Sequence, residues 1–446
     1  MTDFATTTDS RWIDPHATGA AVLARRAGTE SRTPGLVEAG TEAAAHTRHR
    51  LVLIHPIDPR GNKVGGIETH VRVMLQRHPE DFSVLLVGVD GRGDLAIGKP
   101  VKIDVGGRVI DFLPVVHVPD DEIHQAATSI GRSITFRVAT ALLRHYRTIR
   151  RLIGKGPATV ELQRFEFAPF ARALGLPVVQ IVHGEGSKDQ KMDSLIKRFW
   201  FVHAAAERIA LALADRIVGV NPNIVKRIEA EFPAHARKAS FMTVSVDTEI
   251  FPPVPFDVSD DVLRIVFTGR LDAFKDPPLM FRVIERLGRA LDGRVEFHYV
   301  GTSDPHRYAE FAAIEHLTVR HGFKDAKGVH EVLTRCHAGI LTSYFEGMPC
   351  FLLETMSTGR PMGAIRLPQY DPLVETGRTG FLVERLDDTA ATVEAMTAAW
   401  LGLWAGIKSG TIRTEAVHER VVPYSVDTQL PRLFDIHRAL AAPRHG

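Results

Sequence analysis

The sequence has 446 residues, of which 44% are hydrophobic and 24% charged, and its formal net charge is +2 at pH 7. These proportions are typical of a soluble chain of about two or three domains, and so small a net charge gives no global attraction to nucleic acid. Two cysteines, Cys336 and Cys350, exclude a disulfide framework and cysteine metal motifs, which favours a reducing, cytoplasmic setting. No apolar run approaches the ~18 residues that span a bilayer.

Residues 1–48 are rich in Ala, Thr, Glu and Arg and have little periodicity, so we expect a mostly disordered tail. Short apolar runs typical of buried parallel strands then alternate with helical patterns. The strand candidates are 51–54, 83–87, 178–182 and 216–220. Such alternation predicts an α/β domain with a parallel sheet, which we assign to residues 49–245.

A second series of strand candidates follows a proline-containing linker at 244–260. Its members are 263–267, 295–300, 317–320, 338–341, 362–365 and 380–383. We therefore predict a second α/β domain over residues 246–425. The remaining segment, 426–446, is predicted to be a helix that crosses back to the first domain. The fold class is thus two Rossmann-like, doubly wound domains that face each other across a cleft.

The most informative stretch contains two glutamates, Glu346 and Glu354, separated by seven residues. Pro349 lies between them and is suited to open a helix, which Gly359 would end, so we predict a helix over 349–358. Free backbone amides at a helix N-terminus bind phosphate readily. The loop thus predicts a phosphate seat with a carboxylate on each side, as a nucleotide-sugar would need.

Two cations follow the first strand of the second domain. Arg270 and Lys275 lie five residues apart around a short loop, where they would neutralise a diphosphate. The alternative is a solvated loop in which Arg270 pairs with Asp272. We favour the diphosphate site because ligands bind at the carboxyl ends of strands in doubly wound sheets.

Weaker signals end two strands of the first domain. Gly65 and Gly66 precede a helix and would let the backbone approach an anion, although a glycine pair is more often a plain turn. His183 ends a strand and would bind a sugar hydroxyl or stabilise charge, although a lone histidine is more often structural. Glu161 and Glu166 are candidates to face a second substrate, without an assigned role.

A paired-carboxylate hydrolase is a rival interpretation of the two glutamates. Eight residues of helix would separate them by about 12 Å, whereas retaining glycosidases need about 5–5.5 Å. An Asp-x-Asp motif is also absent from the sequence, so no obvious carboxylate pair awaits a divalent metal. Cations and helix amides would then have to stabilise a leaving diphosphate.

Basic residues with interleaved apolar ones occupy two stretches of the first domain. The first stretch includes Arg132, Arg137, Arg144, Arg147, Arg150, Arg151 and Lys155, and the second includes Lys188, Lys191, Lys197 and Arg198. Basic helices of this kind bind anionic membranes, which predicts a peripheral location at the inner membrane face. An ordinary surface helix with a core-facing stripe is the alternative.

Residues 51–440 resemble the retaining GT-B glycosyltransferases of family four, group 1 type, which include bacterial mannosyltransferases, sucrose synthases and relatives of glycogen synthase. The E-x7-E motif of Glu346 and Glu354 is the most specific mark, and Thr268-Gly-Arg270 with Lys275 is the second. Where the family often has a Pro-x-Gly-Val-Asp turn, this chain has 244–247 without the proline and the glycine.

The resemblance implies a role for each matched residue. Arg270 and Lys275 would hold the donor diphosphate, and Glu354 would bind the ribose. Glu346 would bind hydroxyls of the transferred sugar, and His183 would face that sugar near the reacting carbon.

Backbone contacts complete the implied donor site. Gly347, Met348 and Pro349 would contact sugar or phosphate through the backbone, and Gly65 and Gly66 would close over the diphosphate. The donor would be a UDP- or GDP-sugar, with no cofactor and no metal. The first domain would bind the acceptor, a glycan or a lipid-linked hydroxyl, in cell-surface polysaccharide or glycolipid synthesis.

Two other functions stay open at this point. A sugar-nucleotide epimerase or phosphorylase would use the same fold for a different reaction. A non-catalytic subunit that binds a nucleotide-sugar is the second alternative, although the complete set of Arg270, Lys275, Glu346 and Glu354 argues against it.

Overall fold

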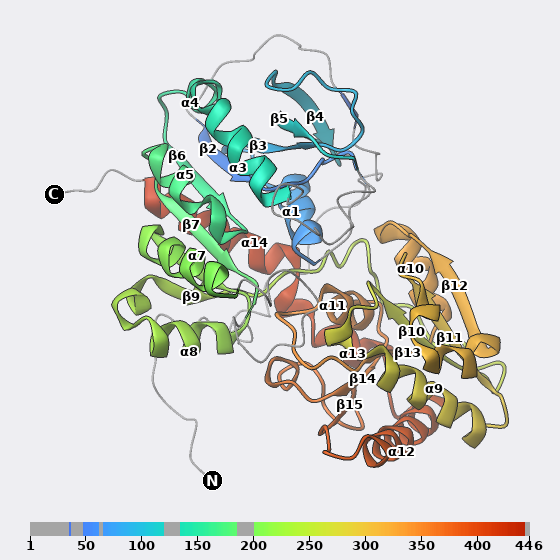
Figure 1. Cartoon of the computed structure of the whole chain (residues 1–446). Coiled ribbons are helices and arrows are strands. Elements are labelled where there is room, and N and C mark those ends of the chain that lie inside the picture. Colours follow the sequence, from blue (N-terminus) through green and yellow to red (C-terminus); the bar gives the residue numbers. More distant parts are fainter. Residues whose placement is uncertain (1–34, 37–47, 62–65, 120–133, 185–199, 442–446) are drawn as a thin grey trace. The chain divides into compact units, whose positions relative to one another are not determined.

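The structure is a computed structural model that describes residues 35–36, 48–61, 66–119, 134–184 and 200–441 (Figure 1). These residues divide into two compact units. Unit 1 contains the described residues up to 184, residues 200–243 and residues 429–441, and unit 2 contains residues 244–428. Gly65 and the basic residues from Arg132 and from 188 to 198 that were singled out above lie outside the described residues.

Unit 1 is built on a nine-stranded sheet with the order β1-β4-β5-β3-β2-β6-β7-β8-β9. Its strands are β1 Gly35–Leu36, β2 His49–Ile54, β3 Phe82–Asp90, β4 Val101–Val105, β5 Arg108–His117, β6 Ala158–Leu162, β7 Val178–Val182, β8 Arg216–Gly219 and β9 Ala239–Phe241. All neighbouring pairs are parallel except β1 with β4 and β4 with β5. Because β1 pairs with β4, part of the predicted tail belongs to the sheet.

The helices of unit 1 connect these strands. They are α1 Gly66–Arg77, α3 Ile134–Arg144, α4 Tyr146–Ile153, α5 Ala168–Ala173, α7 Trp200–Leu213 and α8 Pro222–Glu231. The last helix, α14 Val426–Ala441, returns to this unit from Gln429 onward. There Phe434 packs against Phe82 of β3 with ring centroids 4.8 Å apart, and Arg438 bonds Asp81 at 2.8 Å.

Unit 2 is built on a parallel six-stranded sheet with the order β12-β11-β10-β13-β14-β15. Its strands are β10 Leu263–Thr268, β11 Val295–Val300, β12 Thr318–Gly322, β13 Ala338–Leu341, β14 Met362–Ile365 and β15 Gly380–Val383. Its helices are α9 Pro277–Ala290, α10 Ala326–Arg335, α11 Cys350–Ser357, α12 Thr389–Lys408 and α13 Thr414–Glu419. Figure 1 shows α9 alongside α12.

The apolar runs explain why these sheets are parallel and covered. Buried strands such as β2 and β13 are apolar on both faces, as a sheet packed by helices on each side requires. The predicted α/β class with two Rossmann-like domains is therefore confirmed. None of the helices in the described part of the chain combines the length and the apolar character that a bilayer crossing requires.

Candidate functional site

Two loops of unit 2 meet because β10 and β13 are neighbours in a parallel sheet, so their carboxyl ends lie at one edge. The backbone N–H of Tyr344 donates to the carbonyl of Phe274 at 2.8 Å. The hydroxyl of Thr342 donates to the carbonyls of Lys275 at 2.7 Å and Asp276 at 3.1 Å. Direct hydrogen bonds therefore join the loop that carries Lys275 to the loop that carries Glu346.

Lys275 and Glu346 form an ion pair at the junction of these loops. The Lys275 Nζ lies 2.6 Å from the Glu346 Oε1, and the two side chains are only 15% and 10% exposed. The hydroxyl of Ser343 donates to the same carboxylate oxygen at 2.8 Å, and the Gln369 amide donates to the Glu346 carbonyl at 2.8 Å. The structure thus brings together two residues that are 71 positions apart in the chain.

Arg385, which follows β15, holds both loops from one side. Its Nη1 lies 2.6 Å from the Oδ2 of Asp276, and its Nη2 donates to the carbonyl of Thr342 at 2.5 Å. Its guanidinium also covers the ring of Tyr344 at 3.9 Å from the centroid. Asp276 adopts a left-handed φ of 51° and caps α9 through the N–H of Leu279, which makes its geometry demanding. Sequence reasoning missed Arg385 because no spacing links it to the two loops.

Helix α11 begins at Cys350, one residue later than predicted, because Pro349 takes the N-cap position with an extended ψ of 122°. The helix ends where predicted, since Gly359 has a φ of +79°. Glu354 is half-buried in its second turn, and its carboxylate has no side-chain partner within the described residues. Burial raises the pKa of Glu354 to about 7.

Two buried aromatic or polar groups near Glu346 were not predicted. Tyr370 is fully buried, and its hydroxyl has no hydrogen-bond partner among the described residues. Burial, and then the negative charge of Glu346, raise the pKa of Tyr370 well above its usual range. Gln369 precedes it and holds the backbone of Glu346, as described above. Both residues follow β14, so position at a strand end was the only available signal.

The remaining predicted donor-site residues of unit 2 take different positions. Arg270 is 57% exposed and pairs with Asp272 at 2.9 Å, which is the arrangement that we weighed as the alternative. Met348 and Pro349 are buried, and Gly347 between them and Glu346 is half-buried. The loop geometry therefore brings Lys275, but not Arg270, to Glu346.

In unit 1, His183 directly follows β7 and is half-buried. Its Nε2 lies 2.5 Å from the Oε1 of Gln163, and its ring packs edge-on to that of His70 at 6.2 Å. Burial, then the neighbouring His70 and His55, lower the pKa of His183 to about 3, so its imidazole is neutral at pH 7. Gly66 begins α1 and is exposed.

Glu161 corrects one expectation. We expected it to face a second substrate, but its side chain is fully buried under α14 and bonds Gln163 and His437. A carboxylate with two such partners in the core cannot contact a ligand. Glu166, by contrast, is exposed.

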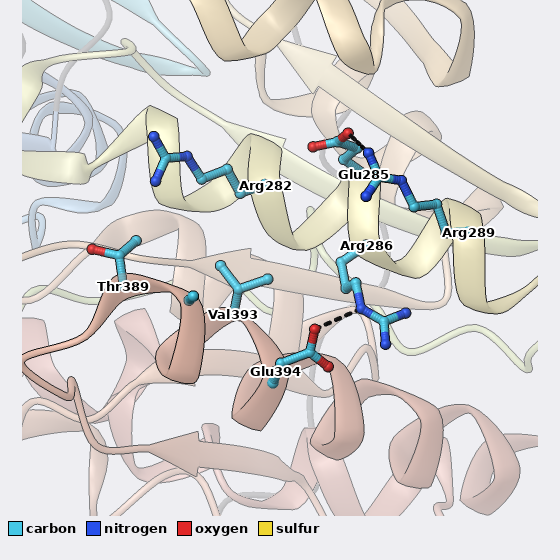
Figure 2. Close-up of a pocket in the computed structure, with 8 residues that line it drawn as sticks. Arg282, Glu285, Arg286, Arg289, Thr389, Val393 and Glu394 are labelled. Atoms are coloured by element: carbon cyan, nitrogen blue, oxygen red, sulfur yellow. Dashed lines mark hydrogen bonds and ion pairs between the residues drawn. The ribbon is translucent and has the colours of Figure 1, made fainter.

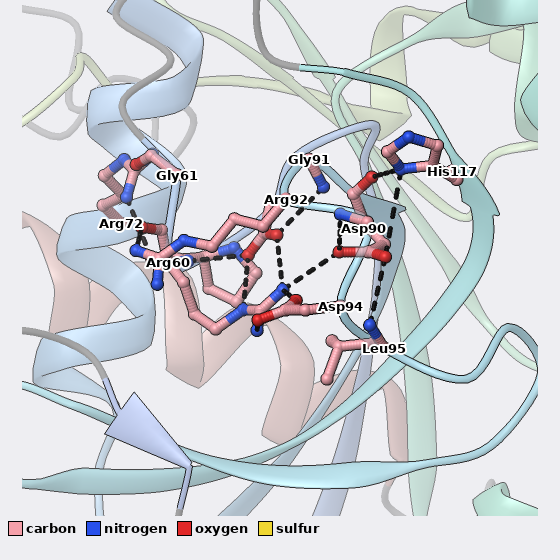
Figure 3. A network of polar contacts seen from close by, with 12 residues as sticks. Arg60, Gly61, Arg72, Asp90, Gly91, Arg92, Asp94, Leu95 and His117 are labelled. Atoms are coloured by element: carbon pink, nitrogen blue, oxygen red, sulfur yellow. Dashed lines mark hydrogen bonds and ion pairs between the residues drawn. The ribbon is translucent and has the colours of Figure 1, made fainter.

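The loop between β2 and α1 is anchored by a buried polar network (Figure 3). Arg60 is 5% exposed and contacts the carboxylates of Asp58 at 2.9 Å, Asp90 at 3.1 Å and Asp94 at 2.8 Å. From α1, Arg72 donates to the carbonyl of Gly61 at 2.6 Å. These contacts fix the chain up to Gly61, immediately before the predicted glycine pair.

The described part of the basic stretch is only partly available to a partner. Arg137 donates to the carbonyl of His117 at 2.6 Å, and Arg150 donates to the carbonyl of Leu174. Other basic residues of α3, α4 and the turn that follows are exposed, namely Arg144, Arg147, Arg151 and Lys155. Two apolar side chains of α3 accompany them at the surface, since Phe136 is 51% and Leu143 is 69% exposed.

A hollow of about 200 Å³ between α9 and α12 contains none of the predicted site residues (Figure 2). Arg282, Arg286 and Arg289 line it, and each has a carboxylate partner. Its charges are thus neutralised locally, so we do not treat it as the candidate site. Within the described ranges, no three His, Cys, Asp or Glu side chains are arranged to hold a metal ion.

Comparison with known sequences identifies one part of the chain. Residues 263–400, which include most of unit 2, match the family model described as glycosyl transferases group 1. The chain is also 26% identical over 223 residues to the D-inositol 3-phosphate glycosyltransferase of Geodermatophilus obscurus, covering 45% of this chain and 50% of that protein. The chain thus spans about half the length of the curated relatives it matches.

Solved structures show the fold over most of the chain. The sucrose-phosphate synthase of Thermosynechococcus elongatus superposes with a TM-score of 0.69 at 16% identity, over 89% of this chain and 100% of that one. The Anabaena protein HepE in complex with UDP and glucose gives a TM-score of 0.62 at 14% identity, over 88% and 100%. The expected GT-B fold and the resemblance to group 1 glycosyltransferases are therefore confirmed, whereas the E-x7-E assignment stays a prediction.

Proposed function

We propose, for a chain of GT-B fold whose residues 263–400 match the group 1 glycosyl transferases, that it transfers a hexose from a UDP- or GDP-sugar to a hydroxyl with retention of configuration. The acceptor in this proposal is a glycan or a lipid-linked sugar of a cell-surface pathway. No metal or other cofactor is required in the proposal.

The observation that carries the proposal is the ion pair of Lys275 with Glu346 beside the N-terminus of α11. A diphosphate that enters here would meet a lysine held at the carboxyl end of β10 and the amides of a helix, both of which attract negative charge. Phosphate oxygens would replace the Glu346 carboxylate on Lys275. Glu346 would then accept hydrogen bonds from the sugar, while Ser343 keeps it in place.

Other residues take supporting roles in the proposal. Glu354, with its unpartnered carboxylate, accepts hydrogen bonds from the ribose hydroxyls. Arg270, at 57% exposure, turns from Asp272 to the diphosphate when the donor binds. Gly65, Gly66, Gly347 and Met348 contribute backbone contacts, and neutral His183 meets a sugar hydroxyl.

The proposed reaction needs charge stabilisation more than a strong base. The acceptor oxygen forms a bond to the anomeric carbon on the face that the diphosphate leaves, and the bond from that carbon to the phosphate oxygen breaks. The acceptor proton passes to the departing phosphate, so the products are a glycoside and UDP or GDP. Lys275 and the α11 amides stabilise the charge that develops on the diphosphate.

A lipid-linked acceptor would be met at an anionic membrane surface. The exposed arginines of α3 and α4, together with Phe136 and Leu143, support this part of the proposal. The protein would then be peripheral, with its basic helices on the lipid headgroups.

A donor panel tests the function. Purified protein is incubated with UDP- and GDP-hexoses, and release of the nucleotide diphosphate is measured with and without EDTA. Slow release of one diphosphate supports a transferase, and its loss in EDTA would contradict metal independence. Conversion of a sugar-nucleotide into an epimer, or of a glycan into a sugar phosphate with inorganic phosphate, would instead identify the epimerase or phosphorylase. Tight donor binding without any turnover would favour the non-catalytic subunit.

A further inference from the structure

A row of polar side chains lies buried along one face of β6. Thr159, Glu161 and Gln163 alternate along the strand and its end, so they share a face of the sheet. Their exposed fractions are 0%, 0% and 5%. Polar groups in such a position need hydrogen-bond partners, and each of these three has them.

The first arm of the row leads from Glu161 to His183. The Gln163 Nε2 lies 2.6 Å from the Glu161 Oε1. The other amide atom of Gln163, Oε1, lies 2.5 Å from the His183 Nε2. His183 is thus connected to the core through one amide.

The second arm leads from Glu161 to the C-terminal helix. The Oε2 of Glu161 lies 2.9 Å from the Nε2 of His437 on α14. The His437 Nδ1 lies 2.9 Å from the Thr159 hydroxyl, which in turn lies 2.8 Å from the His49 Nε2. Both oxygens of the buried carboxylate are therefore engaged.

The chemistry of a carboxylate fixes the direction of every bond. An ionised Glu161 can only accept, so Gln163 must turn its NH₂ toward it and its carbonyl toward His183. His183 must then carry its proton on Nε2. By the same reasoning His437 donates from Nε2 and accepts at Nδ1 from Thr159, whose oxygen accepts from His49. All donors in both arms point toward Glu161.

We propose that Glu161 and Gln163 are positioning residues that lock His183 in the Nε2–H tautomer and leave its Nδ1 to accept a hydrogen bond from a ligand hydroxyl. Nδ1 has no partner among the described residues. The identity of that hydroxyl, on the donor sugar or the acceptor, rests on the proposed function. The tautomer itself does not.

The groups around His183 keep it neutral, as the lock requires. His70 packs on its ring, and the Nε2 of His55 lies 3.5 Å from the Oε1 of Glu68. Burial, His70 and His55 lower the pKa of His183, whereas Glu68 raises it by less. A neutral imidazole has one donor and one acceptor nitrogen, so fixing Nε2–H determines the role of Nδ1.

The test compares two variants that each break one arm. Gln163→Leu removes the partner of His183, whereas Thr159→Val breaks the far arm and leaves Gln163 in place. Full-length protein labelled with ¹⁵N-histidine is studied without substrate by long-range ¹H–¹⁵N correlation, and the His183 signals are identified by their loss in His183→Gln. We expect Nε2–H for His183 in the wild type and in Thr159→Val, and a mixture of tautomers in Gln163→Leu.

An Nδ1–H tautomer in the wild type, or an unchanged His183 in Gln163→Leu, would overturn the proposal. Should Gln163→Leu fail to fold, Glu161→Gln replaces it. Its neutral amide must donate to one arm, so either His183 or His437 should lose its Nε2 proton. Retention of both protons would likewise sink the idea.

Kinetics give a second readout. If His183 contacts a hydroxyl in the reaction, kcat should fall about tenfold in Gln163→Leu, the lower end for loss of an orienting partner, with donor KM little changed. An unchanged kcat alongside a changed tautomer would retain the lock and remove the catalytic role of His183. Loss of the tautomer preference and of kcat in Thr159→Val as well would show a general structural effect and contradict the assignment.

Discussion

The loops of unit 2 and the strand ends of unit 1 handle charge in opposite ways. In unit 2, Lys275 and Glu346 carry full charges and Glu354 has no side-chain partner within the described residues. In unit 1, His183 is neutral, and its hydrogen bonds lead into the core to a single carboxylate, Glu161. The first arrangement can exchange partners with a ligand, whereas the second has its directions fixed before a ligand arrives.

The difference indicates a division of labour. Charged groups that pair with each other lose little when a phosphate replaces one partner, so they suit the binding of an anion. A neutral imidazole on a rigid chain of hydrogen bonds suits the orientation of a hydroxyl, because it attracts no counter-ion. Variants that disturb charge should therefore act differently in the two units.

The largest effect on stability is expected from Arg60→Met in unit 1. Without the guanidinium, Asp58 and Asp90 are left as buried charges, which should cost about 3–5 kcal/mol of unfolding free energy. Urea denaturation measures this loss. Arg108→Met is the control, because Arg108 lies at the surface and pairs with Glu80 at 3.4 Å. A loss below 1 kcal/mol in Arg60→Met would mean that the network contributes little.

Lys275→Ala in unit 2 should act on turnover rather than on folding. If the lysine stabilises the departing diphosphate, kcat should fall about 10²–10³-fold, the usual effect of removing one electrostatic stabiliser. Steady-state nucleotide release measures the change, with Lys324→Ala, in the exposed loop before α10, as the control. Near-normal turnover in Lys275→Ala would rule out its assigned role.

Glu354→Ala should weaken donor binding by a smaller factor. Loss of a charge-assisted hydrogen bond is worth about 1.5–3 kcal/mol, so we expect donor KM to rise at least tenfold with a smaller change in kcat. Binding of the free nucleotide diphosphate, measured by calorimetry, should weaken in parallel. An unchanged affinity for the nucleotide would place the ribose elsewhere.

Glu354 also predicts a pH dependence of stability. Its folded pKa of about 7 lies above the ordinary value of 4.5, so the folded state binds the proton more tightly than the unfolded state. Its contribution to stability is therefore present below about pH 4.5 and is lost as the pH rises through about 7. The Tm of Glu354→Gln relative to wild type should increase by about 2–4 °C between pH 5 and pH 8. The exposed Glu415→Gln should give a constant difference, and a constant difference for Glu354→Gln would contradict the raised pKa.

The smallest effect concerns the outer surface of unit 1. Arg144→Glu should lower co-sedimentation with anionic vesicles several-fold, since one basic residue near such a surface is worth about 1 kcal/mol. Arg413→Glu, at an exposed position of unit 2, makes the same change in net charge and is the control. Equal effects of the two variants, or no binding by the wild type at low salt, would remove the membrane from the proposal.

Apolar runs made most of the sheet strands predictable, because a parallel strand covered on both faces has to be continuously apolar. The prediction missed β6, where Thr159 and Glu161 interrupt the run, and those same residues form the buried polar row. It also missed β4 and β5, whose antiparallel pair includes charged residues such as Asp111 and Lys102. Buried polar partners far apart in the chain leave no local pattern.

The candidate site was predictable as a set of loops but not as a set of contacts. Spacing and strand ends identified Lys275, Glu346 and Glu354, but no spacing reveals that Lys275 bonds Glu346 while Arg270 bonds Asp272. Those choices depend on the register of β10 and β13 and on Arg385, which fixes the turn at Asp276.

The buried contact of Glu161 with His437 joins residues separated by 276 positions. During synthesis on the ribosome, the first unit emerges long before its covering helix, so it must wait with β6 incompletely buried while the whole of unit 2 is made. Contacts of such long range slow folding and leave sticky intermediates. Nascent chains stalled before residue 429 should consequently be the form of this protein that chaperones hold most firmly.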